Sequence, residues 1–366
     1  MPEVEVDFSK KAGGELKINV SYNNTLSQER KKLEEFIKPY SNNIIILYID
    51  SVSRSNSVRK LKKTLSFIEK FMPYKGLHNE KNPYENFHSF QFFKYHSFFG
   101  YTPQNYPVLF YGNDRSSKKV YLTKYLKKNG YITCYASDLC AKEVVRTYQN
   151  FTLDEVFDHQ FVLCDPNKQH IYENSIKCLY GKIDTEHLYV YGDQFWRKYK
   201  DNRKYLQIVT NEGHEGSLES LKYIDNTLYN FLENLFNDNF LKETSILFLS
   251  DYGVGTASIY YLYDFYKFEK RLPMLYIIMN DRKNISYSEQ YKYLHKNQQT
   301  FITGYDIYNT IINIIYGDKY FLIKKKFVLN ETRRTKFSKS LFEDINQKER
   351  KPQLFNMSEW LCVENK

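Results

Sequence analysis

Two aspartates stand where buried strands are expected to end. Asp50 follows the apolar run 44–49, and Asp251 follows the run 246–249 after a single serine. Unbroken apolar runs of this length are typical of strands buried on both faces, as in a parallel sheet covered by helices. Ligands of open α/β sheets bind outside the carboxyl ends of the strands. The two carboxylates are therefore expected to share one crevice and to bind a hard or borderline cation, although either aspartate alone is more typical of a helix N-cap.

A hydroxyl group lies between the two aspartates in the sequence. Thr102 stands in the segment Gly100–Gly112, directly before a proline and an apolar stretch. A hydroxyl at such a junction can act as a nucleophile when a bound metal lowers its pKa. Taken alone, a threonine in this place is more typical of a cap or a turn, so its importance depends on where the aspartates lie.

The apolar pattern predicts the elements that must position these groups. Strands are expected at residues 44–49, 106–110, 132–136, 206–210, 247–249 and 274–279, and helices at 26–37, 58–71, 217–236 and 305–316. Residues 77–93 are expected to form a loop, and residues 141–200 an irregular excursion. The pattern indicates an α/β fold with three α/β/α layers and a mostly parallel central sheet.

Composition and charge exclude several classes of protein. The chain has 366 residues, 42% of them hydrophobic and 26% charged, which is enough for one large core. Its net charge of +10 is spread in short runs such as 324–326, whereas a nucleic-acid surface needs clustered basic residues. The spread of charge is most typical of a generally lysine-rich surface, with a mild attraction for anionic substrates as the functional alternative, and a nucleic acid is not an expected partner. No apolar run approaches the roughly 20 residues of a membrane span.

The cysteines and sequons indicate the compartment in which the protein is expected to work. None of the five cysteines forms a CxxC pair, so a structural zinc site is not expected. Sequons stand at Asn23, Asn150, Asn284, Asn330 and Asn356. The acidic, polar N-terminus does not read as a signal peptide. Cysteines and sequons together favour an extracellular or secretory-pathway location.

The same pattern predicts three regions. Residues 1–40 form an N-terminal extension, the α/β domain occupies 41–320, and a basic C-terminal extension packed on the core occupies 321–366.

The order of several motifs resembles that of a known family. The motifs are Asp-Ser-x-Ser-Arg at 50–54, Gly-x-Thr-x-x-Asn at 100–105, a histidine with an acidic neighbour at 214–215, and Ser-Asp-x-Gly at 250–253. This order resembles the alkaline phosphatase/sulfatase superfamily and, within it, the sulfatase-like family DUF229. Further similar segments lie at 129–132, 178–181, 269–273, 301–310 and 340–362, so the resemblance covers about residues 43–362.

The resemblance implies a fold of alkaline phosphatase type and a set of roles. Asp50, Thr102 and Asp251 would ligate a divalent metal (zinc, manganese, magnesium or calcium), and Thr102 would be the nucleophile that forms a covalent ester. His214 would bind a second metal or the leaving group, or would only begin a helix. Asn105 would bind an anionic oxygen, and Arg54 would be a charge partner of the site or an ordinary salt-bridge residue. The implied substrate is a phosphate or sulfate ester on a glycan, a lipid head group or a small molecule.

One position departs from the family pattern. The family has Ser-Asp-His-Gly where this chain has Tyr252 in place of the histidine. A neutral phenol is a poor ligand for zinc or magnesium, so the alternative to an enzyme is a catalytically degenerate domain with a binding or structural role. No cysteine or serine stands in the Cys/Ser-x-Pro-x-Arg context of conventional arylsulfatases, and a threonine nucleophile favours phosphoryl-type transfer.

Overall fold

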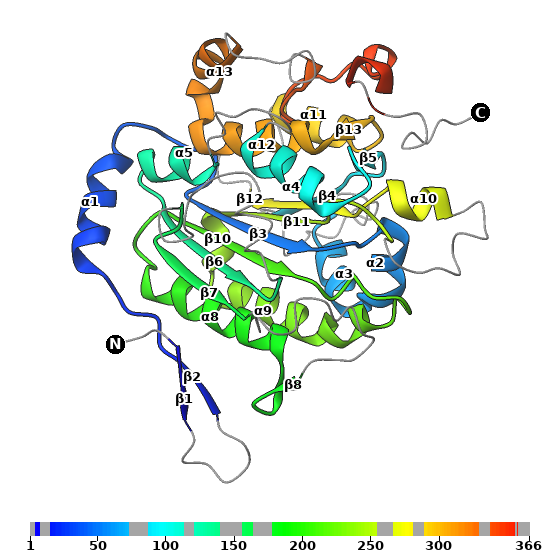
Figure 1. The fold of residues 1–366 in the computed structure, drawn as a ribbon. Coiled ribbons are helices and arrows are strands. Elements are labelled where there is room, and N and C mark those ends of the chain that lie inside the picture. The colour runs from blue at the N-terminus through cyan, green and yellow to red at the C-terminus, as the bar shows by residue number, and fades with distance from the viewer. Residues whose placement is uncertain are drawn as a thin grey trace, which may run out of the picture.

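A seven-stranded sheet forms the centre of the molecule, in the order β4-β12-β11-β3-β10-β6-β7 (Figure 1). The computed structural model describes residues 4–7, 15–72, 87–112, 121–139, 156–163, 178–254, 266–280, 289–328, 337–355 and 357. The strands are β3 (Asn43–Ile49), β4 (Phe87–Gln91), β6 (Ile132–Ser137), β7 (His159–Val162), β10 (Lys204–Thr210), β11 (Thr244–Leu249) and β12 (Leu275–Asn280). Strands β11, β3, β10, β6 and β7 are parallel, and β12 runs antiparallel to both of its neighbours.

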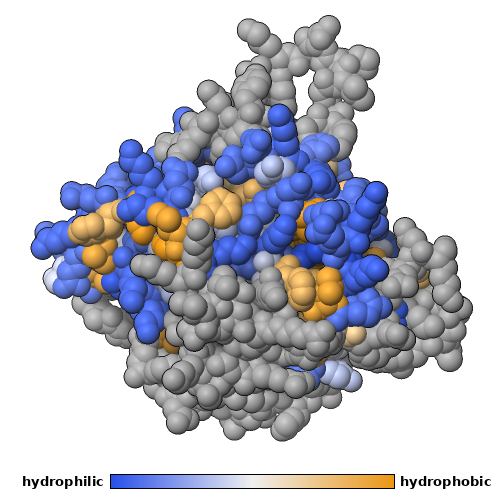
Figure 2. Space-filling model, turned by 90° about the horizontal axis from the view of Figure 1, so that it is seen from above, coloured by the Kyte–Doolittle hydropathy of each residue, from blue (hydrophilic) through white to orange (hydrophobic). Residues whose placement is uncertain are grey.

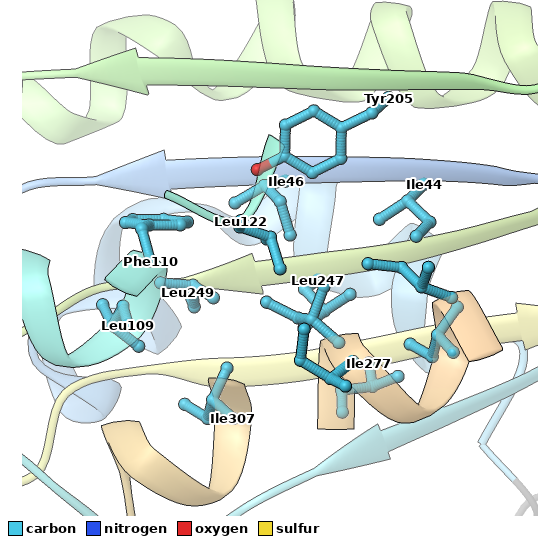
Figure 3. Packing of buried hydrophobic residues seen from close by; sticks show 14 of the residues in the cluster. Ile44, Ile46, Leu109, Phe110, Leu122, Tyr205, Leu247, Leu249, Ile277 and Ile307 are labelled. Atoms are coloured by element: carbon cyan, nitrogen blue, oxygen red, sulfur yellow. The ribbon is translucent and has the colours of Figure 1, made fainter. Parts of the chain in front are cut away.

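Helices cover both faces of this sheet. One face packs against α4 (Thr102–Tyr111), α5 (Thr123–Lys128) and α12 (Gly304–Tyr316), and the other against α3 (Lys62–Glu69), α8 (Asp184–Lys198) and α9 (Asp225–Asn237). In β3, Ile44 and Ile46 face the first layer (Figure 3), whereas Ile45 and Leu47 face the second. Both faces are buried, which explains the unbroken apolar run. The predicted three-layer α/β/α fold with a mostly parallel sheet is confirmed.

Shorter elements surround the three layers. The remaining helices are α1 (Asn24–Glu34), α2 (Arg54–Lys60), α10 (Tyr266–Arg271), α11 (Glu289–Asn297) and α13 (Tyr320–Val328). Two-stranded pairs are β1 (Val4–Asp7) with β2 (Glu15–Ile18), β5 (Tyr95–His96) with β13 (Ile302–Thr303), and β8 (Cys178–Leu179) with β9 (Lys182–Ile183). Short 3-10 turns lie at Ser220–Ile224, Phe240–Glu243, Gly317–Lys319, Gln347–Glu349 and Pro352–Phe355.

Three sequence predictions of local structure were wrong. The expected strand 106–110 belongs to helix α4, because a short apolar run buried on most sides does not distinguish a helix from a strand. Pro103 in the first turn and Gly112 in a left-handed C-terminal position were the signals of that helix. The irregular region contains α8, whose many aromatic residues have modest helix propensity. The expected loop contains the edge strand β4.

Two predicted helices have different limits. The segment 58–71 lies in two short helices, α2 and α3, separated at Leu61. The segment 217–236 begins as a 3-10 turn at Ser220 and becomes α9 only at Asp225.

The coloured part of the face seen from above is mostly hydrophilic (Figure 2). Seen from above, the side of α11, α12 and α13 carries polar side chains with small, separate apolar groups among them (Figure 2). Within the described ranges, no helix combines the length and apolar character that crossing a bilayer requires.

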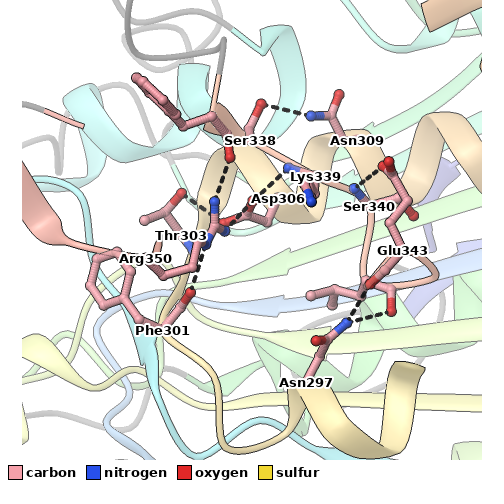
Figure 4. Close-up of polar contacts among 12 residues, drawn as sticks. Asn297, Phe301, Thr303, Asp306, Asn309, Ser338, Lys339, Ser340, Glu343 and Arg350 are labelled. Carbon is pink, nitrogen blue, oxygen red and sulfur yellow. Dashed lines mark hydrogen bonds and ion pairs between the residues drawn. The ribbon is translucent and has the colours of Figure 1, made fainter. Parts of the chain in front are cut away.

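A buried ion pair attaches the C-terminal segment to α12 (Figure 4). Asp306, in the first turn of α12, accepts hydrogen bonds from the backbone N–H groups of Thr303 and Lys339, each at 2.8 Å. Its Oδ1 also lies 2.6 Å from Nη2 of Arg350, and the two side chains are 0% and 5% exposed. Arg350 donates further hydrogen bonds to the carbonyl oxygens of Phe301 and Phe337. One guanidinium therefore links three segments.

We expect Arg350→Met to lower the free energy of unfolding by about 3–5 kcal/mol, because it leaves the Asp306 carboxylate buried without its charge partner. Urea denaturation measures this loss. The control is Lys296→Met, which breaks the half-exposed pair of Lys296 with Asp344 and should change stability by less than about 1 kcal/mol. Equal small losses in both variants would contradict the anchoring role of Arg350.

Candidate active site

Four neighbouring strands end at the same edge of the sheet. Strands β11, β3, β10 and β6 are parallel, so their carboxyl ends lie together. Asp251 follows β11, Asp50 follows β3, the loop with His214 follows β10, and Asp138 follows β6. This edge is where open α/β sheets bind ligands.

The register of β3 and β11 places the two aspartates beside each other. Leu249 pairs with Tyr48, so Asp251 lies opposite Asp50 two residues further along, on strands about 4.8 Å apart. Because side chains alternate along a strand, both carboxylates lie on the face of Tyr48 and Leu249, the face that α4 covers. Asp50 is 3% exposed and Asp251 is 1% exposed.

Helix α4 brings a hydroxyl group to this pair. Thr102 is the first residue of α4, and its Oγ1 donates a hydrogen bond to Oδ1 of Asp50 at 2.8 Å. The helix has no side-chain N-cap hydrogen bond, so Thr102 does not serve as a cap. Asp50 is not a cap either, because Ser53 caps α2 by accepting a hydrogen bond from the Asn56 N–H. The structure thus brings together the three residues expected to ligate a metal.

Asp251 is a buried carboxylate whose oxygens make no hydrogen bond of good geometry in the part of the chain that the structure describes. Both of its oxygens are inaccessible to solvent and have no hydrogen-bond partner among the described residues. Burial raises the pKa of Asp251 well above its usual range, and the charge of Asp50 raises it further, although the nearby hydroxyls of Tyr48 and Thr102 lower it in part. Burial also raises the pKa of Asp50, although the hydrogen bond from Thr102 lowers it. Two charged carboxylates side by side therefore require a compensating cation or proton.

Three buried phenols surround the carboxylates. Burial raises the pKa of Tyr48 and Tyr252 well above 10, and the charges of both aspartates raise each further. Burial raises the pKa of Tyr95 as well, with a contribution from Asp251. All three tyrosines therefore stay neutral. Tyr48 and Tyr95 stand in segments that look like ordinary core, so the sequence did not indicate them as site residues. Only the two-residue offset of Tyr48 from Asp50 was a signal.

Close backbone contacts fix the loops of the site. A Cβ atom added to Gly213 would lie 2.2 Å from the carbonyl oxygen of Asp50, so only glycine lets the β10 loop approach. A Cβ added to Gly253 would lie 1.6 Å from the carbonyl oxygen of Glu269. The Ser51 hydroxyl donates to the carbonyl oxygen of Gly253 at 3.0 Å. The segments after β3, β10 and β11 are thus held against each other and against α10.

His214 lies at the same edge as the aspartates. It stands in a turn in which its N–H bonds the carbonyl oxygen of Asn211 at 3.0 Å, so it does not begin a helix. Its ring centroid is 6.5 Å from that of Tyr252. Burial lowers the pKa of His214, and the charge of Asp251 opposes that shift. The imidazole is therefore mainly neutral at pH 7.

The two residues expected to bind substrate make other contacts. The side-chain amide of Asn105 accepts from the N–H of Phe99 and donates to its carbonyl oxygen, both at 2.8 Å, so it braces the loop before Thr102. Arg54 lies over the ring of Phe93 at 5.4 Å, toward β4 and β12. Neither contact brings its side chain to the carboxylate pair, and a role in substrate binding stays a prediction for both.

The residues present fit a cation through oxygen ligands. Among the described residues, no group of three or more His, Cys, Asp or Glu side chains is arranged to hold a metal. The available donors are the two carboxylates, the Thr102 hydroxyl and the neighbouring phenols. The unpartnered oxygens of Asp251 are the observation that favours a cation, since a buried charge needs a partner.

Comparison with solved structures bears on the fold. A protein in the alkaline phosphatase superfamily from Vibrio parahaemolyticus has a TM-score of 0.50 and 13% identity, covering 81% of this chain and 76% of that chain. The lipoteichoic acid synthase LtaP from Listeria monocytogenes has a TM-score of 0.48 and 13% identity, covering 79% and 78%. The C-terminal periplasmic domain of EcEptC from Escherichia coli, in complex with Zn, has a TM-score of 0.48 and 13% identity, covering 75% and 82%. At this identity, the first similarity shows the fold alone.

Comparison of sequences identifies the family. No curated protein matches the chain. The family model described as "Protein of unknown function (DUF229)" matches residues 13–364, which is nearly the whole chain. The chain therefore belongs to the DUF229 family, and its fold is that of the alkaline phosphatase superfamily.

Proposed function

We propose that the protein hydrolyses or transfers a phosphate or sulfate ester, with Thr102 as nucleophile and a divalent cation held by Asp50, Asp251 and Thr102. The supporting observation is the Asp251 carboxylate, whose buried oxygens make no hydrogen bond of good geometry among the described residues. This carboxylate lies next to Asp50, which accepts the hydrogen bond from Thr102. A buried charge of this kind is unfavourable unless a cation or a proton neutralises it.

The side chains of the site divide the chemistry among them. Oγ1 of Thr102 attacks phosphorus or sulfur, a Thr–O bond to that atom forms, and the bond to the leaving oxygen breaks. Oδ1 of Asp50, which already accepts the hydroxyl hydrogen bond, takes the proton. The neutral His214 gives a proton to the leaving oxygen. Water or an acceptor hydroxyl then attacks the transferred group and gives its own proton to His214, and the bond to Oγ1 of Thr102 breaks as that oxygen takes back the proton held by Asp50. A bound cation would lower the pKa of the Thr102 hydroxyl and would neutralise charge on the transferred group.

The donor set favours a hard cation. Carboxylate, hydroxyl and phenol oxygens suit magnesium, calcium or manganese, whereas imidazole suits zinc. Tyr252 is buried among these oxygens, and the family resemblance expects a histidine at its position. We therefore propose manganese or magnesium as the working cation of the wild-type site.

We also propose that the substrate is an anionic ester of a glycan, a lipid head group or a small molecule, met outside the cell or in the secretory pathway. On this proposal the α/β domain at residues 41–320 carries the whole site, and residues 1–40 and 321–366 are extensions of it.

A catalytically degenerate domain is the second candidate function. Burial raises the pKa of both aspartates, so a shared proton could neutralise the pair without a cation. In that case the crevice would bind a partner or serve a structural role, and turnover would be absent.

Removal of the nucleophile tests the enzymatic proposal. With p-nitrophenyl phosphate, bis-p-nitrophenyl phosphate and manganese, we expect Thr102→Val to lower kcat by roughly 10³-fold, because no hydroxyl remains to attack. Thr102→Ser should retain measurable turnover. The control is Thr64→Val, a buried threonine on α3 in the opposite layer, which should leave kcat unchanged. Unchanged turnover in Thr102→Val would exclude Thr102 as the nucleophile, and a wild type without turnover would favour the degenerate domain.

Stability measurements test the cation site without any substrate. An acid whose pKa is raised by folding stabilises the protein below its ordinary pKa and loses that contribution as the pH rises through the folded pKa. In metal-free protein at pH 8, we therefore expect Asp251→Asn to raise the unfolding midpoint by at least about 2 °C, with the gain disappearing toward pH 4. Manganese should stabilise the wild type and not this variant.

The control for this experiment is Asp158→Asn. Asp158 is paired with Arg30 at 2.9 Å, so its neutralisation should destabilise the protein. Equal manganese stabilisation of the wild type and Asp251→Asn would place the cation elsewhere.

Substitution of Tyr252 tests which metal the site prefers. We expect Tyr252→His to tighten zinc binding by at least about tenfold, equivalent to about 1.4 kcal/mol, because imidazole replaces a neutral phenol beside the aspartates. Calorimetric titration with zinc measures the change, and Tyr252→Phe, which removes the hydroxyl without adding a ligand, should show no gain. Tight zinc binding by the wild type, unchanged in the histidine variant, would mean that another side chain such as His214 completes the zinc site.

A further inference from the structure

We propose that Ser51 and Ser250, the serine pair, are positioning residues that hold Asp50 and Asp251 in place for a cation before any cation binds. This inference rests on the proposed function and identifies the groups that prepare its metal site. Each serine is the chain neighbour of one aspartate, since Ser51 follows Asp50 and Ser250 precedes Asp251. Both serines are 0% exposed, so their hydroxyl groups need partners within the protein.

The hydroxyl groups of the serine pair join the loop after β3 to the loop after β11. Oγ of Ser51 donates a hydrogen bond to the carbonyl oxygen of Gly253 at 3.0 Å. In the other direction, the N–H of Val52 donates to Oγ of Ser250 at 2.9 Å, and that hydroxyl donates to the carbonyl oxygen of Tyr252 at 2.9 Å. Each serine therefore bonds to the backbone of the opposite loop, two residues after the aspartate of that loop.

The backbone of Ser51 has a conformation that serine rarely adopts. Its φ of 62° lies in the left-handed region, which is unfavourable for a residue with a Cβ atom. Strain of this kind persists only where surrounding contacts hold it, and it is concentrated at functional sites. Glycine would adopt the same backbone without the strain. What serine adds at this position is the hydroxyl bond to Gly253.

Ser51 also contacts the polar groups of the site directly. Burial raises the pKa of Asp50, whereas hydrogen bonds from the Thr102 hydroxyl and from the backbone N–H of Ser51 are among the contacts that lower it. Burial and the charges of both aspartates raise the pKa of Tyr252, and the Ser51 and Thr102 hydroxyls lower it in part. Ser51 therefore reaches the carboxylate with its backbone and the phenol with its side chain.

The two aspartate loops need such a connection in the metal-free protein. Charged carboxylates side by side repel each other, and this repulsion acts to separate the loops that carry them. A metal binds more tightly when its ligands already lie near their final positions, because less ordering is needed on binding. Hydrogen bonds from serine hydroxyls to the backbone oppose the repulsion and leave the carboxylate oxygens available to the cation.

Manganese titration followed by electron paramagnetic resonance tests this role. We expect Ser51→Gly to bind manganese at least about tenfold more weakly than the wild type. Because glycine relieves the left-handed backbone, the unfolding midpoint of this variant should stay within about 2 °C of the wild type. Ser51→Ala and Ser250→Ala should show a similar loss of affinity and a lower midpoint. With p-nitrophenyl phosphate, saturating manganese should restore kcat to within about threefold, because the bound cation then holds the carboxylates itself.

The matched control is Ser89→Ala. Ser89 belongs to β4, is also 0% exposed, and donates through Oγ to the carbonyl oxygen of Ile68 at 2.8 Å. Its substitution removes the same kind of hydrogen bond away from the site. This variant should therefore have a lower unfolding midpoint and bind manganese as the wild type does.

The outcomes separate the two proposals. Wild-type manganese affinity in Ser51→Gly and Ser250→Ala would overturn the role of the serine pair and leave the proposed function intact. An equal loss of affinity in Ser89→Ala would also overturn it, because the effect would then be one of general stability. If an alanine variant does not fold, Ser51→Gly, which favours the native backbone, decides the question. A wild type that neither binds manganese nor cleaves aryl phosphate or sulfate esters would refute the proposed function, and the role of the serine pair with it.

Discussion

Two carboxylates buried side by side are the constraint around which this end of the molecule is built. Asp50 and Asp251 stand opposite each other because β3 and β11 are parallel neighbours in a fixed register. The sheet therefore places two negative charges a few ångströms apart in a region without solvent, where each raises the pKa of the other or demands a counter-charge. Glycines at 213 and 253 let the adjoining loops close over the pair.

Some of the surrounding groups stay neutral beside the two carboxylates, and one interacts with them directly. Neutral tyrosines fill the space beside the carboxylates, and only the Thr102 hydroxyl donates a hydrogen bond of good geometry to Asp50 from α4. A site of oxygen donors with one hydroxyl in contact suits a hard cation and a threonine nucleophile. On this view, the two buried carboxylates destabilise the metal-free protein, and a bound cation offsets that effect.

Much of the fold could be predicted from the sequence, because strands buried on both faces leave unbroken apolar runs that end in polar residues. Asp50 and Asp251 were found in this way, whereas Thr102 was singled out by its place before a proline and an apolar segment and by the family resemblance. Helix α4 was mistaken for a strand, because five apolar residues in a row suit either structure. Tyr48 and Tyr95 were missed because a phenol in a core segment has the same pattern whether it packs or faces a site.

A crystal soaked in manganese, with anomalous scattering measured at the manganese edge, tests the central claim most directly. The proposed site requires one strong peak at about 2.0–2.6 Å from oxygens of Asp50, Asp251 and Thr102. Oγ1 of Thr102 should then face the metal while its hydrogen still points to Asp50. A crystal with manganese bound elsewhere and none between these three residues would contradict it.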